Sequence, residues 1–194
     1  MTCDCHTQTE SGLQKDVLVR LLVINAIMAG LEFVVGILAE SSGVIADSLD
    51  MLADALVYGL ALYAVGHPDV IKARVARWSG LFQVGLAVSI LVDVVRRAVF
   101  GSEPHSLLMT IVSIGALAAN AYCLVLLSRH RRGEVHMRAS WIFTRSDVIA
   151  NLGVLAAAGL VAVTGSRWPD LLIGAAISAV IVAGGLVLCP GNNF

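Results

Sequence analysis

The sequence predicts an all-α membrane protein with six transmembrane helices. Of its 194 residues, 58% are hydrophobic and 14% are charged, whereas soluble domains carry about 25% charged residues. The mean hydropathy is +0.85. Hydrophobic spans, each close to the roughly 20 residues that cross a bilayer, follow one another with short connectors at residues 17–38, 44–65, 79–100, 107–127, 141–164 and 171–188.

The ends of the chain are short and polar. We therefore expect a polar cytoplasmic tail at 1–16, one transmembrane domain at 17–189 and a short tail at 190–194. The first tail holds Cys3, Cys5 and His6. Thiolate and imidazole groups suit soft or borderline metals, and the alternative interpretation is a disordered terminus. The net charge of −1 gives no basic surface, so we expect no nucleic-acid partner.

Lysine and arginine gather in alternate connectors, which sets the predicted orientation. They flank the first span and lie in the second and fourth connectors, at Lys15, Arg20, Lys72, Arg74, Arg77, Arg129, Arg131, Arg132 and Arg138. The opposite side holds Arg167, with Arg96 and Arg97 late in the third span. Cytoplasmic loops are rich in these residues. We expect a multi-pass protein of a bacterial-type inner membrane with both termini in the cytoplasm.

The second span carries three carboxylates, Asp47, Asp50 and Asp54, in an otherwise apolar run. At 100° per residue, these offsets place all three side chains on one narrow stripe of a helix. An Asp at the centre of a membrane helix costs roughly 2.5–3.5 kcal/mol on insertion scales. A bound cation, protons or cationic side chains on neighbouring helices must offset this cost.

The fifth span carries a second pair of oxygen-bearing side chains. Asp147 and Asn151 are four residues apart, like Asp50 and Asp54, and share one helix face. If the two faces meet, four side-chain oxygens converge, which is enough for the first shell of a divalent cation.

These motifs resemble the cation diffusion facilitator family. The resemblance covers about residues 17–188 and is carried by ADSLDMLADAL in the second span, by RASWIFTRSDVIANLGV around the fifth and by WPDLLIGAAISAVIV in the sixth. It implies a six-helix bundle of that family in which Asp50, Asp54 and Asp147 bind the metal. The remaining family position falls on Phe143, which has no lone pair to give. Either three ligands suffice, or Asn151 supplies the fourth, which we favour.

The sequence also departs from the pattern of the family that it resembles. The chain looks like a short form that lacks the C-terminal cytoplasmic domain, so homodimer formation rests on the membrane helices. The expected ligands are oxygen atoms and include no imidazole, a set that does not favour strict selectivity for zinc. The transported metal is therefore one of Zn, Mn, Fe, Co or Cd. We expect the metal as transported substrate and expect no prosthetic group. Two further residues are candidates for accessory roles. Asp47 is a candidate for gating or for pairing with a charged side chain, and Glu32 is a candidate for lining the cavity that holds the metal.

The predicted function is secondary-active efflux of divalent metal cations, in exchange for protons, and not enzymatic catalysis. Like charges crowded in a poorly solvated site oppose simultaneous ionisation, so metal arrival is expected to expel a proton. Two alternatives stay open. The first is an intramembrane aspartyl protease, in which two Asp on adjacent helices share a proton and activate water. The second is a partner subunit that does not transport metal, because Phe143 occupies a position where the family has a metal ligand.

Overall fold

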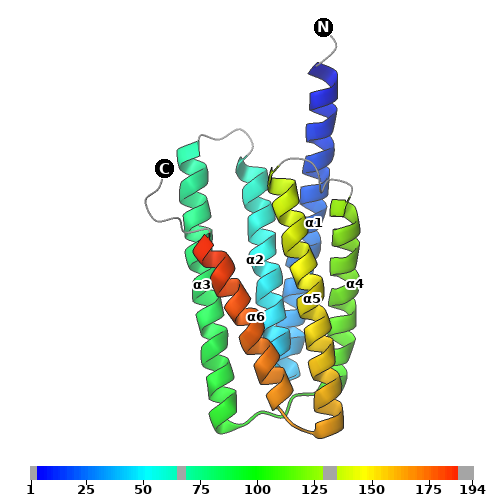
Figure 1. Cartoon of the computed structure of the whole chain (residues 1–194), viewed down its shortest axis with the longest axis vertical. Helices are drawn as coiled ribbons and strands as arrows, with labels where there is room; N and C mark the ends of the chain where they lie inside the picture. The colour runs from blue at the N-terminus through cyan, green and yellow to red at the C-terminus, as the bar shows by residue number, and fades with distance from the viewer. Residues whose placement is uncertain (1–3, 65–68, 129–134, 188–194) are drawn as a thin grey trace.

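The computed structural model describes residues 4–64, 69–128 and 135–187, and this part of the chain forms six helices (Figure 1). The all-α prediction is confirmed. α1, α3 and α5 each begin well before the corresponding hydrophobic span, because polar flanks lower the hydropathy but do not interrupt helical hydrogen bonding. The helices are α1 Asp4–Leu38, α2 Ser42–Ala64, α3 Asp69–Phe100, α4 Ser106–Ser128, α5 Val135–Thr164 and α6 Trp168–Val187.

Four of the helices enclose the interior of the bundle. α1 packs on α2 and α4, and α5 packs on α4 and α2. α3 and α6 pack on each other and lean against α2 from one side, with α6 crossing the bundle obliquely (Figure 1). α2 therefore contacts every other helix and is the central element of the fold.

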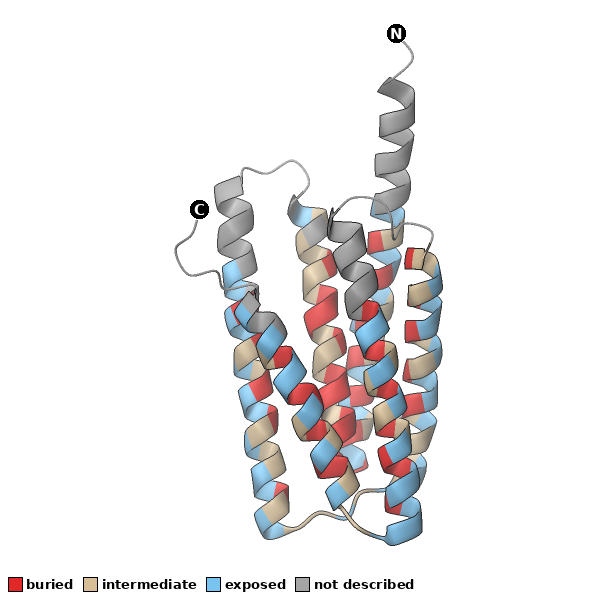
Figure 2. Ribbon diagram, viewed as in Figure 1, coloured by how far each residue is buried: buried red, intermediate tan, exposed pale blue. Residues whose placement is uncertain are grey.

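The outer surface is apolar and the interior is partly polar, the reverse of a soluble bundle. Buried residues line the inward faces, and exposed residues run along the outside of each helix (Figure 2). On α1 the exposed apolar residues recur every three or four positions, which makes a continuous stripe facing lipid, at Val19, Val23, Ile27, Leu31, Val34 and Leu38. Lys15–Leu38, Ser106–Ser128 and Thr144–Thr164 are long and apolar enough to cross a membrane.

The turns at 39–41, 101–105 and 165–167 meet at one end of the bundle, which we call the three-loop end. The His105 amide donates to the Ala39 carbonyl at 2.9 Å, and the Glu103 amide donates to the Glu40 carboxylate at 3.2 Å. α5 ends before Gly165, whose φ of 63° is the left-handed conformation that closes many helices. The two bonds between the 39–41 and 101–105 turns fix the end of α1 relative to the start of α4.

A buried carboxylate joins α6 to the N-terminus of α2 at the same end. Asp170 is fully buried. It accepts from the Ser42 amide at 2.8 Å and the Gly43 amide at 3.0 Å, and from the Ser41 hydroxyl at 2.5 Å. Acidic groups are stabilising at a helix N-terminus because the first amides have no partner within the helix. The contact sets the position of α2, and with it the acidic stripe.

Asp93 forms ion pairs with two arginines late in α3. The Arg97 guanidinium lies 2.6 Å from the Asp93 carboxylate, and Arg96 pairs with the same group at 2.6 Å. The Ser42 hydroxyl also donates to Asp93, at 3.3 Å. The role of this pair is structural, because it ties α3 to the start of α2.

Candidate cation site

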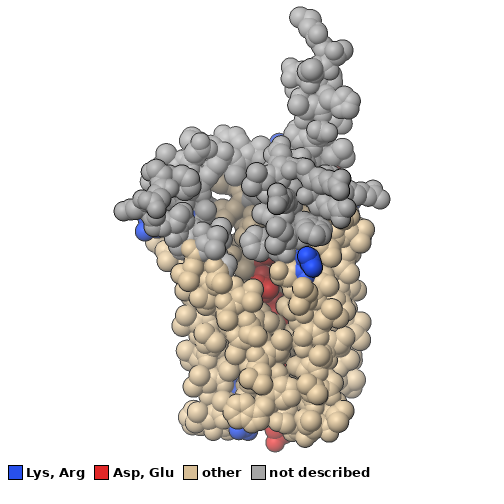
Figure 3. Space-filling model, in the orientation of Figure 1, with Lys and Arg blue, Asp and Glu red and all other residues tan. Residues whose placement is uncertain are grey.

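The acidic stripe of α2 faces the interior of the four-helix set. Asp47 is 2% exposed and Asp54 is 7% exposed, while Asp50 is half-buried. Carboxylates this deeply buried are costly unless paired or bound to a cation. In Figure 3, acidic atoms are visible within the uncharged surface of this face, between α5 and α6. Part of the acidic interior is therefore exposed on this face.

The α5 pair meets this stripe. The carboxyl groups of Asp54 and Asp147 lie within hydrogen-bonding reach of each other, and Asp50 is a further charged neighbour of Asp147. The Asn151 side-chain amide donates to the Asp147 carbonyl at 3.0 Å and lies 3.4 Å from the Asp47 carboxylate. The two helix faces that the sequence could only suppose to meet are in contact.

Two oxygens on α5 have no hydrogen-bond partner within the described part of the chain. They are Oδ2 of Asp147 and Oδ1 of Asn151, and both side chains are buried. Buried polar atoms are nearly always satisfied in folded proteins. Unpaired acceptors beside a carboxylate pair are what a cation would use as ligands.

Tyr58 and Thr144 complete the site, and the sequence analysis missed both. The Tyr58 hydroxyl donates to Asp54 Oδ2 at 3.0 Å and lies 2.8 Å from the Thr144 hydroxyl. Their positions were a usable signal, because Tyr58 is four residues after Asp54 and Thr144 is three before Asp147, which places each on its ligand's helix face. Such partners fix the orientation of a ligating carboxylate.

Glu32 enters the same interior from α1. It is 1% exposed, and neither of its carboxyl oxygens has a hydrogen-bond partner among the described residues. Its charged neighbours are Asp47 and Asp50. Asn25, seven residues earlier on α1, uses its amide group on the Leu21 carbonyl of its own helix at 2.9 Å.

Some predicted residues lie outside the described part of the chain. These are Cys3 and the side chains of Cys5, His6 and Phe143. Among the residues that are described, no three His, Cys, Asp or Glu side chains are gathered closely enough to hold a metal as they stand.

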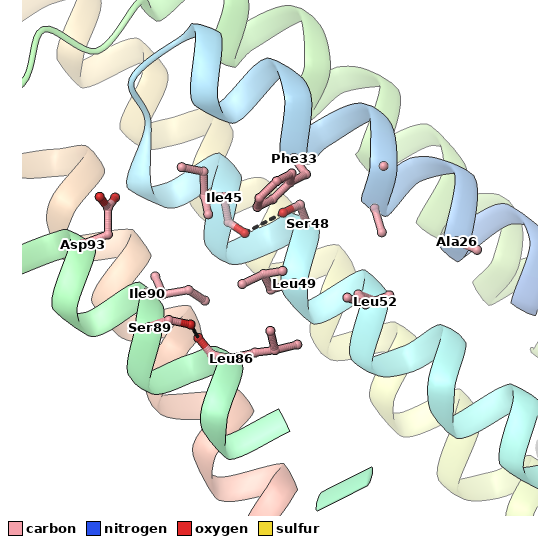
Figure 4. Close-up of a pocket in the computed structure, with 12 residues that line it drawn as sticks. Ala26, Phe33, Ile45, Ser48, Leu49, Leu52, Leu86, Ser89, Ile90 and Asp93 are labelled. Carbon is pink, nitrogen blue, oxygen red and sulfur yellow. Dashed lines mark hydrogen bonds between the residues drawn. The ribbon is translucent and has the colours of Figure 1, made fainter. Parts of the chain in front are cut away.

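A cavity of about 610 Å³ between α1, α2 and α3 is a poor candidate for the ion path. Figure 4 shows that its lining is almost wholly apolar, with Ser48 and Ser89 hydrogen-bonded to carbonyls of their own helices. Asp93, at one end, is already paired with arginines. A divalent cation would find no unpaired ligand there.

The helical bundle buries carboxylates and unpaired oxygens between four of its helices, and such groups are able to bind a cation. The model of a family described as the cation efflux transmembrane domain matches residues 18–67 and 75–189. The chain therefore belongs to this family, the cation diffusion facilitators, and the predicted resemblance is confirmed.

Curated relatives agree with this assignment. A cation efflux system protein CzcD from Alcaligenes sp. (strain CT14) is 25% identical over 201 residues, which covers 97% of this chain and 61% of the relative. A metal cation efflux system protein CzcD from Cupriavidus metallidurans is 25% identical over 197 residues, covering 95% and 60%. A zinc transporter ZitB from Yersinia pestis is 26% identical over 179 residues, covering 84% and 57%. The chain spans about 60% of the length of these relatives.

Proposed function

We propose that the protein is a secondary-active transporter that moves divalent metal cations out of the cytoplasm in exchange for protons. The observation that carries the proposal is the meeting of Asp54 on α2 with Asp147 on α5, inside an apolar bundle. Family membership supports transport over the intramembrane aspartyl protease that the same pair of carboxyls suggests.

The proposed ligands are Asp50, Asp54, Asp147 and Asn151. Asp147 and Asn151 each have an unpaired buried oxygen, and Asp50 is a charged neighbour of both Asp54 and Asp147. Rotation of Asp50 toward the Asp54–Asp147 pair would gather three carboxylates and one amide oxygen. Such an all-oxygen set accepts Mn²⁺ readily and Zn²⁺, Fe²⁺, Co²⁺ or Cd²⁺ as well. Two relatives are named metal or cation efflux proteins and another is named a zinc transporter.

Proton exchange follows from the crowding of carboxylates. Asp50 has Asp47 and Asp54 as charged neighbours on one stripe, and Asp147 adds a fourth carboxyl. Like charges this close cannot all ionise without a cation, so metal binding displaces protons and weakens as pH falls. An inward proton gradient then drives metal outward.

The membrane setting is part of the proposal. The end of the bundle opposite the three-loop end faces the cytoplasm, because the sequence gathers its lysines and arginines in the connectors of that end. We place the protein in a bacterial-type inner membrane as a homodimer that associates through its membrane helices.

The proposal is tested by flux in proteoliposomes. The purified protein is reconstituted, a pH gradient of either sign is imposed, and Mn²⁺ or Zn²⁺ is followed with a trapped dye. We expect uptake to follow the gradient, to stop in Asp54→Asn and to persist in the matched control Asp16→Asn, whose side chain is exposed on α1.

Each other outcome contradicts a stated part of the proposal. Flux that ignores both gradient and pH would mean uniport. Absence of metal-dependent flux from correctly inserted wild-type protein would favour a non-transporting partner subunit. Wild-type flux in Asp54→Asn would remove that residue from the essential ligands.

A further inference from the structure

We propose a second cation-binding position, one helical turn from the transport site toward the three-loop end, formed by Glu32, Asp47 and Ser113. This inference rests on the proposed function, because the cation that would bind at the second position is the transported divalent metal. The three residues come from α1, α2 and α4, and all three are buried, at 1%, 2% and 1% exposure.

The register of the helices places these residues at one level. Ala29, Met51 and Ala116 contact one another in an apolar cluster. A step of one helical turn, three or four residues, toward the three-loop end leads from Ala29 to Glu32 on α1. The same step leads from Met51 to Asp47 on α2 and from Ala116 to Ser113 on α4. The direction on α4 is fixed by His105, which bonds Ala39 at the three-loop end.

The polar atoms at this level lack partners of their own. Both carboxyl oxygens of Glu32 and the Ser113 hydroxyl are buried without a hydrogen-bond partner in the described part of the chain. Asp47 is the charged neighbour of Glu32, and one of its oxygens lies 3.4 Å from the Asn151 amide group. Two carboxylates and a hydroxyl on three helices offer up to five oxygens, a donor set for a hard or borderline divalent cation.

Asn151 separates the two positions and touches both. Its amide group is turned toward Asp47, and its carbonyl oxygen is unpaired and available to the transport site. Asp47 precedes Asp50 by three residues and Asp54 by seven, so cations at the two positions would lie roughly 5–10 Å apart. A cation leaving Asp54 and Asp147 would have its next ligands within one turn of α2.

The test is Mn²⁺ binding by the full chain in detergent, followed by equilibrium titration and electron paramagnetic resonance. Mn²⁺ is chosen because it prefers oxygen ligands to the thiols of the N-terminal tail. We expect wild type to bind about two ions whose spectra are broadened by their mutual proximity. Glu32→Gln should bind one ion and lose the broadening. Glu103→Gln, at an exposed position of the three-loop end, is the matched control and should behave as wild type.

Two further variants keep the outcome decisive. Asp47→Asn should also bind one ion, and it provides a second test of this position in case Glu32→Gln fails to fold. Asp54→Asn should lose the ion of the transport site and keep one ion at the second position. Two broadened ions in both Glu32→Gln and Asp47→Asn, or one ion in wild type, would overturn the second position and leave the transport site standing. If Asp54→Asn keeps two ions while Glu32→Gln binds one, the proposed transport site is wrong and the second position stands.

Discussion

Removal of the Asp170 carboxylate should detach α6 from the start of α2. In Asp170→Ala the amides of Ser42 and Gly43 lose their acceptors in a fully buried place. The Ser41 hydroxyl keeps a partner, because it also accepts from the Val44 amide at 3.0 Å. The change therefore leaves two main-chain donors unsatisfied.

The magnitude follows from these two donors. A buried donor left without a partner costs about 1–3 kcal/mol, which gives about 2–6 kcal/mol for the pair. Removing a buried charge returns part of its desolvation cost, so we expect Asp170→Ala to lower the free energy of unfolding by about 2–4 kcal/mol. Asp170→Asn keeps one acceptor oxygen but turns an N–H toward an amide, and should lose about 1–3 kcal/mol.

The assay is reversible unfolding in mixed detergent micelles, followed by far-ultraviolet circular dichroism. The order of stability should be wild type, then Asn, then Ala at position 170. Asp16→Ala, at an exposed carboxylate of α1, controls for the loss of a charge as such. If Asp170→Ala were as stable as Asp16→Ala, or Asp170→Asn more stable than wild type, Asp170 would not be what holds α2.

Three other changes probe the site, the packing and the tail. Tyr58→Phe removes the hydroxyl that orients Asp54 and should weaken metal affinity about 10-fold or more, while Tyr122→Phe, on an exposed side chain, should leave affinity unchanged in the same calorimetric titration. Gly174→Val should destabilise by about 1–3 kcal/mol, because a Cβ there would come within 2.9 Å of the Ser42 main chain; Gly159→Val, whose Cβ meets nothing within 4 Å, should cost less in the unfolding assay. Deletion of residues 2–10 should alter the apparent metal affinity in flux assays by less than about 10-fold, and complete loss of transport would make the tail part of the transport site.

Small residues show where local pattern stops being informative. Gly36 and Gly174 are packed against α2, so that a Cβ on either would meet main-chain atoms at 3.0 Å or less, whereas Gly30 on the same helix as Gly36 faces open space. Gly30 and Gly174 are each four residues from another small residue, Ala26 and Ser178, a spacing typical of helix contacts in membranes, whereas Gly36 is not. A spacing identifies a small face, but the neighbouring helix decides whether the face is used.

Composition, helical period and short motifs were enough to predict the helices, their membrane setting, the family and the acidic helix faces. Each of these depends on composition or on the 3.6-residue period, which are properties of short segments. The positions of Asp50 and Asp54 on one helix face, and of Asp147 and Asn151 on another, needed nothing more. The same reasoning could not say that the two faces meet.

Which of these residues are neighbours became known from the packing of the helices. Asp54 lies beside Asp147, the Asn151 amide group lies 3.4 Å from Asp47, and Asp170 caps a helix that begins 128 residues earlier in the chain. Tyr58 and Thr144 are joined across 86 residues. Such contacts depend on how six apolar helices pack, and every helix here is apolar on most of its faces. Hydropathy therefore cannot tell which helices pack together, because this depends on how the side chains of specific helices fit against one another.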